Sequence, residues 1–219
     1  MRDEGTGPTP VLAPVGAARR AELRRSVETF GFAAFDGAIA PEAFDALRAE
    51  ARASLPGALE AERSADGTDL PEGAPRRYRA GITGLGPLAL GFLTDAAVLQ
   101  LLRDYFGGDY AVSEGISCLT VYTSGGHLGA HLDRPTEDCA VTIIVYLDAV
   151  SPAAAAPDTG LVLLVYGEDE ASVGKARLRI PTRPGSIVLG RGSRVWHERP
   201  PLRSGESVVA ITGCFRRLA

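Results

Sequence analysis

Two histidines and an aspartate lie close together in the stretch GGHLGAHLDRP, residues 125 to 135. Alternate residues of an extended strand point to the same face, so His131 and Asp133 are predicted to share one small volume. The third ligand of a metal site would be His197, in the strand-like segment RVWHERPPL. Two imidazoles and one carboxylate are the ligand set of a facial non-heme Fe(II) site, which leaves positions open for substrate, cosubstrate and dioxygen.

The composition narrows the class of partner. The 219 residues carry a net charge of -4, with acidic and basic residues mixed along the chain. This pattern predicts no nucleic-acid partner and no membrane partner, and it favours a small-molecule substrate. The N-terminus lacks the apolar stretch of a secretory signal, so we expect a cytoplasmic protein. The cysteines Cys118, Cys139 and Cys214 are therefore expected to be reduced thiols.

The predicted secondary structure changes from helices to strands along the chain. Apolar periodicity predicts helices over 17–31, 41–55 and 86–107, and β-branched segments bounded by turn residues follow from residue 110 to the end. Helices first and strands after indicate a mainly β fold with flanking helices, that is, an antiparallel double sheet with the helices on one side. We expect residues 1–16 to be a disordered leader and 17–219 to form a single domain.

The order of the ligands along the chain favours a jelly roll. A His-x-Asp strand, a hydrophobic strand, a Gly- and Pro-rich hairpin and a second histidine describe how this fold brings two distant strands to one end of its cavity. The segment 56–79 is rich in Gly, Pro, Asp, Glu and Arg and has little periodicity. It is expected to be a mobile loop that could close over the cavity.

Several motifs together resemble a known family. They are VYTSGGHLGAHLDRP, VTIIVYLD, RIPTRPGSIVLG, WHERPPL and AITGCF, and the N-terminal GFAAFDGAIAPEAFDALRAEA is also similar. In order and spacing the chain resembles the Fe(II)- and 2-oxoglutarate-dependent dioxygenases of the prolyl-4-hydroxylase-like branch. The resemblance implies a double-stranded β-helix, with Fe(II), 2-oxoglutarate and dioxygen as cofactor and cosubstrates.

The sequence departs from this family at one position. The family has a basic residue about ten positions beyond the distal histidine, which pairs with the far carboxylate of 2-oxoglutarate. Here that stretch reads Glu206-Ser207-Val208. A buried dicarboxylate without a cation would cost several kcal/mol of desolvation, so the charge must come from elsewhere or the cosubstrate is different. Arg203 is the first candidate because it lies on the preceding turn, and the others are Arg199, Arg191, Arg194 and Arg216.

The resemblance also suggests polar contacts to the cosubstrate. Tyr146 matches a family tyrosine that hydrogen-bonds the same carboxylate, and Tyr122 and Thr212 are suitably placed. Ser207 would complete the hydrogen bonds beside Arg203. For both tyrosines, packing in the sheet with a hydrated hydroxyl is an equally good interpretation. Two further residues, His127 and Arg134, are candidates for contact with the substrate, although simple solvent exposure explains each of them too.

The activity implied is oxidative. A 2-oxoglutarate-dependent enzyme with this ligand set would hydroxylate, desaturate or cyclise a small metabolite, and the carboxylate of Asp133 disfavours halogenation because it fills the position of the halide. Two alternatives remain. One is an iron oxidase or oxygenase of the same fold that does not use 2-oxoglutarate, which the missing arginine supports, and the other is a jelly-roll binding protein without activity.

Overall fold

The computed structural model describes residues 11–64, 70–152 and 159–219. Within these ranges the α-helices are α1 (Ala17–Phe30), α2 (Pro41–Ser54), α3 (Pro87–Thr94) and α4 (Ala96–Phe106). The strands are β1 (Phe32–Phe35), β2 (Leu59–Ser64), β3 (Arg77–Thr83), β4 (Tyr110–Val112), β5 (Cys118–Tyr122), β6 (His127–His131), β7 (Val141–Val150), β8 (Val162–Val165), β9 (Leu178–Pro181), β10 (Ile187–Gly190), β11 (His197–Arg199) and β12 (Ser207–Arg217). None of the helices in these ranges has the length and apolar character needed to cross a membrane.

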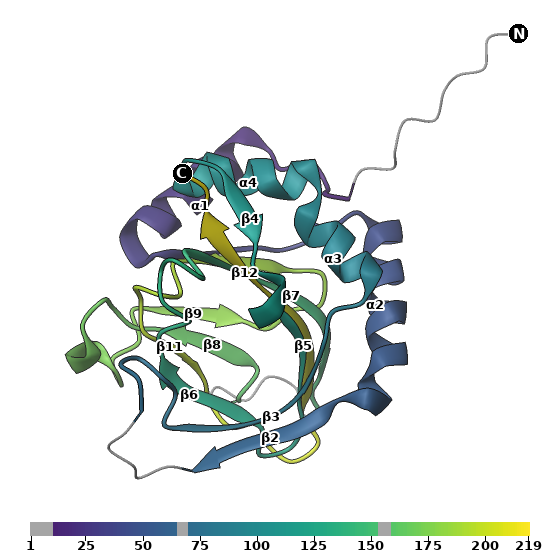
Figure 1. Cartoon of the computed structure of the whole chain (residues 1–219), viewed down its shortest axis with the longest axis vertical. Helices are drawn as coiled ribbons and strands as arrows, with labels where there is room; N and C mark the ends of the chain where they lie inside the picture. The colour runs from purple at the N-terminus through teal and green to yellow at the C-terminus, as the bar shows by residue number, and fades with distance from the viewer. Residues whose placement is uncertain (1–10, 65–69, 153–158) are drawn as a thin grey trace, which may run out of the picture.

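The strands form one antiparallel sheet that curves around a cavity. Their order is β1-β10-β7-β12-β5-β3-β6-β11-β8-β9, with β2 added beside β3 and β4 beside β12. Figure 1 shows the result as a nearly closed barrel, with β6, β8, β9 and β11 opposite the long strands β7 and β12. The predicted mainly β fold with a jelly-roll core is confirmed, and every strand pairing in the described ranges is antiparallel.

The helices pack on the outer face of the long strands (Figure 1). Strand β7 is buried on both faces, so its sequence VTIIVYLDAV reads as a continuous apolar run. Its residues Ile143, Val145 and Leu147 belong to the core shared with the helices. Tyr146, between them, faces the interior of the barrel. The same alternation therefore builds an apolar outer core and an inner wall on which polar side chains stand among apolar ones.

The predicted helices are largely confirmed, but the third is interrupted. α1 ends at Gly31, whose φ of 73° is accessible to glycine at little cost. The segment 86–107 forms α3 and α4 instead of one helix. Asp95 separates them with an extended backbone, and its carboxylate accepts a 2.8 Å hydrogen bond from the Ala97 backbone N–H. Aspartate is a preferred N-cap, and this signal within the apolar run marks the break.

Two predicted segments differ from the structure. The expected mobile loop at 56–79 contains strand β2 and the start of β3, which pair from Leu59–Ile82 to Ser64–Arg77. Periodicity missed β2 because its side chains are mostly exposed and charged. Of the expected disordered leader, residues 1–10 lie outside the described ranges. The following residues are ordered against the domain, because Ala13 N–H donates to Ala38 O and Ala40 N–H donates to Val11 O.

The expectation of three reduced thiols is wrong for two of them. Cys139, just before β7, and Cys214, on β12, form a disulfide with a Cα–Cα distance of 4.9 Å. The sequence separation of 75 residues hides this proximity. The pairing of β7 with β12 creates it, since Cys214 lies opposite Thr142 in the sheet. Cys118 remains a free cysteine.

Candidate metal centre

The three candidate ligands converge at one end of the barrel. His131 is the last residue of β6, and His197 is the first residue of β11, directly opposite it in the ladder. Asp133 lies just beyond the end of β6, where its backbone N–H donates to Gly192 O at 2.9 Å. The carboxylate therefore reaches the imidazoles from a turn that is tied to the segment before His197, and not from the strand itself.

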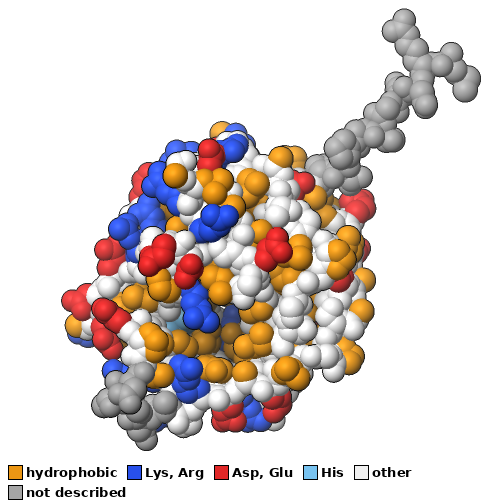
Figure 2. All heavy atoms as spheres, viewed as in Figure 1, with side chains coloured by type: hydrophobic (Ala, Val, Ile, Leu, Met, Phe, Trp, Pro, Cys, Tyr) orange, Lys and Arg blue, Asp and Glu red, His pale blue; other side chains and the backbone are white. Residues whose placement is uncertain are grey.

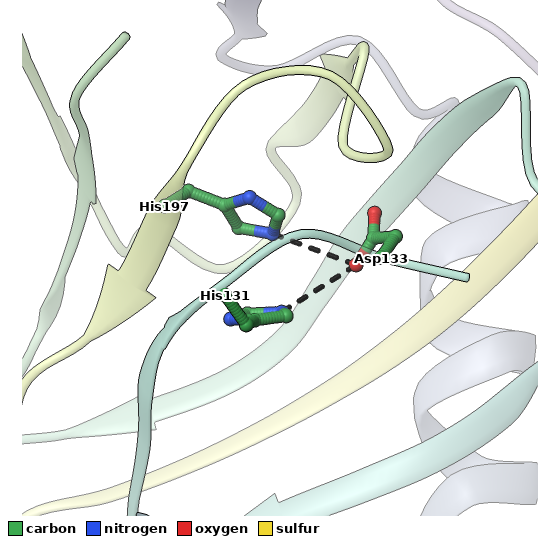
Figure 3. Close-up of side chains that lie close together, drawn as sticks. All are labelled: His131, Asp133 and His197. Atoms are coloured by element: carbon green, nitrogen blue, oxygen red, sulfur yellow. Dashed lines mark ion pairs between the residues drawn. The ribbon is translucent and has the colours of Figure 1, made fainter. Parts of the chain in front are cut away.

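The ligand atoms are spaced for a single ion (Figure 3). Oδ1 of Asp133 lies 3.4 Å from Nε2 of His131 and 3.6 Å from Nε2 of His197, and all three ligand atoms lie within 4.8 Å of one another. Two ligands at right angles, each about 2.1 Å from one ion, would be about 3 Å apart. Small movements of the side chains would therefore bring all three into the first coordination sphere of a divalent cation.

Both imidazoles are held in the tautomer that a metal requires. Nδ1 of His131 lies 2.9 Å from Gly129 O, and Nδ1 of His197 lies 2.9 Å from Val195 O. A carbonyl oxygen only accepts, so each Nδ1 carries the proton and donates it. The Nε2 lone pairs then face the shared point beside Asp133. Such outer hydrogen bonds orient the ring and make the ligand more basic.

The pKa values reflect mutual stabilisation of charge. Burial alone disfavours every charged form here. The Asp133 carboxylate nevertheless raises the pKa of His197. His131 keeps a lowered pKa because of burial and the nearby His197. The charge on His197 and hydrogen bonds from both rings outweigh burial and hold the pKa of Asp133 well below its usual range. Asp133 and His197 therefore stabilise each other's charged forms, and metal ligation would compete with protonation of the imidazoles.

Two residues outside the triad position the Asp133 carboxylate. The Thr142 hydroxyl donates to Oδ2, the oxygen that does not face the histidines. Gly192 leaves the space that the same oxygen needs, because a Cβ at this position would collide with it. The aspartate is therefore held by a strand residue on one side and a glycine turn on the other.

A narrow cavity of about 50 Å³ leads from the metal ligands into the barrel. Arg199 lies on its wall, only 4% exposed. Its guanidinium carbon is 5.3 Å from the ring centroids of both Tyr122 and Tyr146. Figure 2 shows a hollow in this face of the molecule with a histidine side chain at its bottom and apolar and basic side chains around it.

Arg199 is positioned by hydrogen bonds but has no anionic partner among the described residues. Its Nη1 donates to Gly160 O and to Thr182 Oγ1, both at 3.0 Å, and its Nη2 donates to the Tyr146 hydroxyl at 2.8 Å. These bonds use three of the five N–H groups of the guanidinium. Among the described residues no carboxylate forms an ion pair with it. A buried, uncompensated charge is costly, and an anion in the cavity would offset that cost.

The structure brings together some of the predicted cosubstrate residues and not others. Tyr122, Tyr146 and Thr212 line the cavity as expected. Arg203, the first candidate for the missing charge, does not line it; it is exposed, and its backbone N–H donates to the buried Glu206 carboxylate at 2.8 Å. Ser207 is also outside the cavity lining. Glu206 keeps the turn of Arg203 at the rim of the sheet.

The two candidate substrate residues lie outside the cavity lining as well. His127 is half-buried at the start of β6, and its Nδ1 lies 3.0 Å from Gly125 O. Arg134 is exposed and follows Asp133 on the turn. The substrate roles of His127 and Arg134 therefore stay predictions.

The arginine on the cavity wall, Arg199, had a signal in the sequence. His197 and Arg199 are two apart on β11, and the burial along the strand alternates, with Glu198 less buried between them. The spacing rule that pairs His131 with Asp133 therefore also places Arg199 beside His197. Gly160, Thr182 and Thr142 were not predicted. Each acts through a contact with a residue distant in sequence, so no local pattern marks it.

Comparison with known proteins supports the fold. No family model matches the sequence, and no curated protein matches it either. Among solved structures, a prolyl-4-hydroxylase from Pseudomonas putida has a TM-score of 0.60 and 20% identity, over 91% of this chain and 100% of the other. The chain has the fold of the 2-oxoglutarate and iron(II) oxygenases. At such identity, this fold carries no residue role by itself.

Two further solved structures have this fold. SnoN, an α-ketoglutarate-dependent epimerase from nogalamycin biosynthesis, has a TM-score of 0.68 and 11% identity, over 92% of this chain and 82% of the other. HygX from Streptomyces hygroscopicus was solved with nickel, 2-oxoglutarate and hygromycin B. It has a TM-score of 0.63 and 13% identity, over 90% of this chain and 86% of the other.

Proposed function

We propose that the protein is a non-heme Fe(II), 2-oxoglutarate-dependent oxygenase that hydroxylates a small molecule. One observation carries the proposal. A His-Asp-His site and an arginine without a protein anion lie on the same buried cavity. Iron would occupy the first and the far carboxylate of 2-oxoglutarate the second, which gives a use to both features.

The protein's residues would divide the work between the two ends of the cavity. His131, Asp133 and His197 would hold the metal on one face and leave the opposite face open. Arg199 would form a charge-assisted pair with the far carboxylate, and the Tyr146 and Thr182 oxygens would keep its guanidinium in place. Tyr122 would cover the guanidinium with its ring.

When bound, iron supplies the oxidative chemistry through dioxygen, with 2-oxoglutarate as the source of electrons. The protein contributes orientation and exclusion of water. The inner wall around Arg199 includes Leu163, Ile144 and Ala210, so the cosubstrate would lie between apolar groups with polar contacts at its two ends. Asp133 supplies the carboxylate ligand that favours hydroxylation over halogenation.

The preference for a small-molecule substrate rests on two supports. The chain has a mildly acidic balance and no basic stripe. HygX and SnoN were solved with hygromycin B and nogalamycin RO respectively. A related fold from Trichoplax adhaerens was solved with a peptide fragment of hypoxia inducible factor, so a peptide is the competing class.

The first experiment measures iron and succinate together. Protein loaded anaerobically with Fe(II) is expected to retain about one iron per chain and to release succinate from 2-oxoglutarate in the presence of oxygen, at a low rate without substrate. Iron without succinate would instead favour an iron oxygenase that does not use 2-oxoglutarate. Failure to retain any metal would favour a binding protein.

The second experiment tests the arginine. Arg199→Met should weaken 2-oxoglutarate binding to the Mn(II)-loaded protein by about tenfold or more, as loss of a charge-assisted hydrogen bond worth roughly 1.5–3 kcal/mol implies. Isothermal titration calorimetry measures this. The matched control is Arg203→Met, which removes the same charge from the exposed turn and should leave the affinity unchanged. Equal effects of the two substitutions would refute the assignment of Arg199.

A further inference from the structure

A second cavity lies outside the metal site and carries three arginines. Its volume is about 440 Å³, within the range of small-molecule sites. We call it the arginine cavity and define it by Arg191, Arg194 and Arg217, with Tyr110, Thr136 and Glu137 on the same wall. It lies where β4, the end of α4 and the end of β12 meet, close to the C-terminus in Figure 1.

The positive charge of this cavity is not neutralised by the described part of the chain. Glu137 is the one acidic residue of the lining, against three guanidinium groups. None of the three arginines has an ion pair with an acidic side chain among the described residues. Arg194 and Arg217 are exposed and Arg191 is half-buried, and the three line one concave surface from two separate segments.

Two of the guanidinium groups are held by their surroundings. The Arg191 guanidinium lies 5.9 Å from the centroid of the Phe106 ring. That of Arg217 lies over Gly108, where a Cβ would be 2.8 Å from its Nε. Both arginines line the cavity together with the buried Tyr110. Burial raises the pKa of the Tyr110 phenol, and the two arginines oppose this shift. Ordered guanidinium groups lose less entropy when they bind a ligand.

The arginine cavity is built on the segments that carry the metal ligands. Arg191 and Arg194 lie on the turn before His197, and Thr136 and Glu137 lie on the turn after Asp133. The two turns are joined, because the Ser193 hydroxyl donates to Arg134 O and to Cys139 O. A ligand in this cavity would therefore contact both turns that position the metal site.

We propose that the arginine cavity binds a small molecule through a phosphate or carboxylate group. Guanidinium groups match the geometry of both anions and donate paired hydrogen bonds to them. Tyr110 and Thr136 offer hydroxyl groups for the remaining oxygens. The binding step stands independently of the proposed oxygenase activity, because it requires neither the metal nor 2-oxoglutarate.

Inorganic phosphate is the probe for the test. Calorimetric titration of metal-free protein, at constant ionic strength, should show saturable binding that Arg191→Gln/Arg217→Gln weakens by at least about tenfold. Arg194→Gln should also weaken phosphate binding. Arg194 is exposed, so this substitution is not expected to disturb folding. Circular dichroism checks that each variant is folded.

Two controls locate the binding. Arg216→Gln removes the same charge from the neighbouring position of β12, outside the cavity lining, and should leave phosphate binding unchanged. Arg199→Met should also leave it unchanged, which separates the arginine cavity from the 2-oxoglutarate site. No saturable binding to the wild-type protein, or equal loss in the Arg216→Gln variant, would overturn the proposal.

A final measurement distinguishes two sources of the anion. If phosphate competes with a compound that supports turnover in the wild-type protein but not in the Arg191→Gln/Arg217→Gln variant, the arginine cavity holds an anionic group of the substrate. Phosphate that binds equally well but does not compete identifies a separate effector. Both outcomes support the cavity as an anion site, and they assign it to different ligands.

Discussion

The two faces of strand β7 show how one sheet serves stability and chemistry at once. On the helix side, Ile143 and Val145 are fully buried in an apolar core. On the barrel side, Thr142 and Tyr146 are just as inaccessible, but their hydroxyl groups contact Asp133 and Arg199. Solvent exposure therefore does not separate the two faces. The faces differ because the barrel face carries buried hydroxyl groups, and these groups form hydrogen bonds with side chains of the candidate site.

This difference predicts that substitutions on the two faces fail in different ways. A side chain removed from the helix face leaves a cavity that costs free energy of unfolding. A polar group removed from the barrel face leaves a ligand or guanidinium without support, which costs affinity and about 1–3 kcal/mol of stability.

The largest effect is expected from Asp133→Ala. Loss of this ligand should abolish tight Fe(II) binding and turnover, because even outer partners of metal ligands contribute about 10–100-fold in affinity. The metal-free variant should still fold, because the sheet pairs without this carboxylate, but its melting temperature should fall because His131 and His197 lose their charge partner. Asp138→Ala, an exposed position on the same turn, is the control and should bind iron normally. Turnover by the Asp133 variant would contradict the metal assignment.

Ile143→Ala should produce the opposite result. It is expected to lower the free energy of unfolding by about 2–5 kcal/mol, measured by urea denaturation, while the folded fraction keeps its affinity for 2-oxoglutarate. Its neighbour Ile144 lines the cavity, where side-chain packing is already incomplete. Ile144→Ala should therefore cost less stability and disturb cosubstrate binding more. Identical behaviour of the two variants would remove the distinction between the faces.

Thr142→Val keeps the shape of a side chain on the barrel face and removes its hydroxyl. We expect metal affinity to fall by about 10–100-fold, because Asp133 loses the donor to its outer oxygen. Titration with Mn(II) measures this. Thr94→Val removes a hydroxyl from α3 instead, where it bonds only to helix carbonyls, and should leave the titration unchanged. Wild-type affinity in the Thr142 variant would show that the turn alone holds Asp133.

The smallest effect is expected from Tyr146→Phe. Arg199 would lose one neutral acceptor, worth about 0.5–1.5 kcal/mol, so the dissociation constant of 2-oxoglutarate should rise by roughly two- to tenfold. Tyr105→Phe is the matched control on the helix side, where the hydroxyl is 3.5 Å from Arg20 O. It should not change cosubstrate binding. An unaltered constant in both variants would mean that Tyr146 contributes packing alone.

The sequence predicted the three candidate metal ligands because two simple rules apply to them. Strand alternation relates His131 to Asp133, and the order of the segments in a jelly roll relates both to His197. The same alternation pointed to Arg199, but the search for a family position favoured Arg203, which Glu206 keeps at the surface turn. The helix break at Asp95 was also readable as an N-cap within an apolar run.

Other features have no local signal. Strand β2 is exposed and charged, so only its pairing with β3 makes it a strand. Thr142, Thr182 and Gly160 act on residues that the fold brings near them. The role of Gly192 follows from a steric limit that depends on the position of Asp133. Such features require the register of the sheet, which no short stretch of sequence determines.

The disulfide between Cys139 and Cys214 makes the stability of this protein depend on the redox potential around it. A link across 75 residues lowers the entropy of the unfolded chain, which corresponds to about 4 kcal/mol in a simple polymer model. The remaining thiol, Cys118, has a pKa raised by burial to about 11, so it stays protonated and exchanges poorly with the pair. Unfolding measured in a thiol reductant and unfolding measured without it therefore describe two different chains, one closed into a loop and one open.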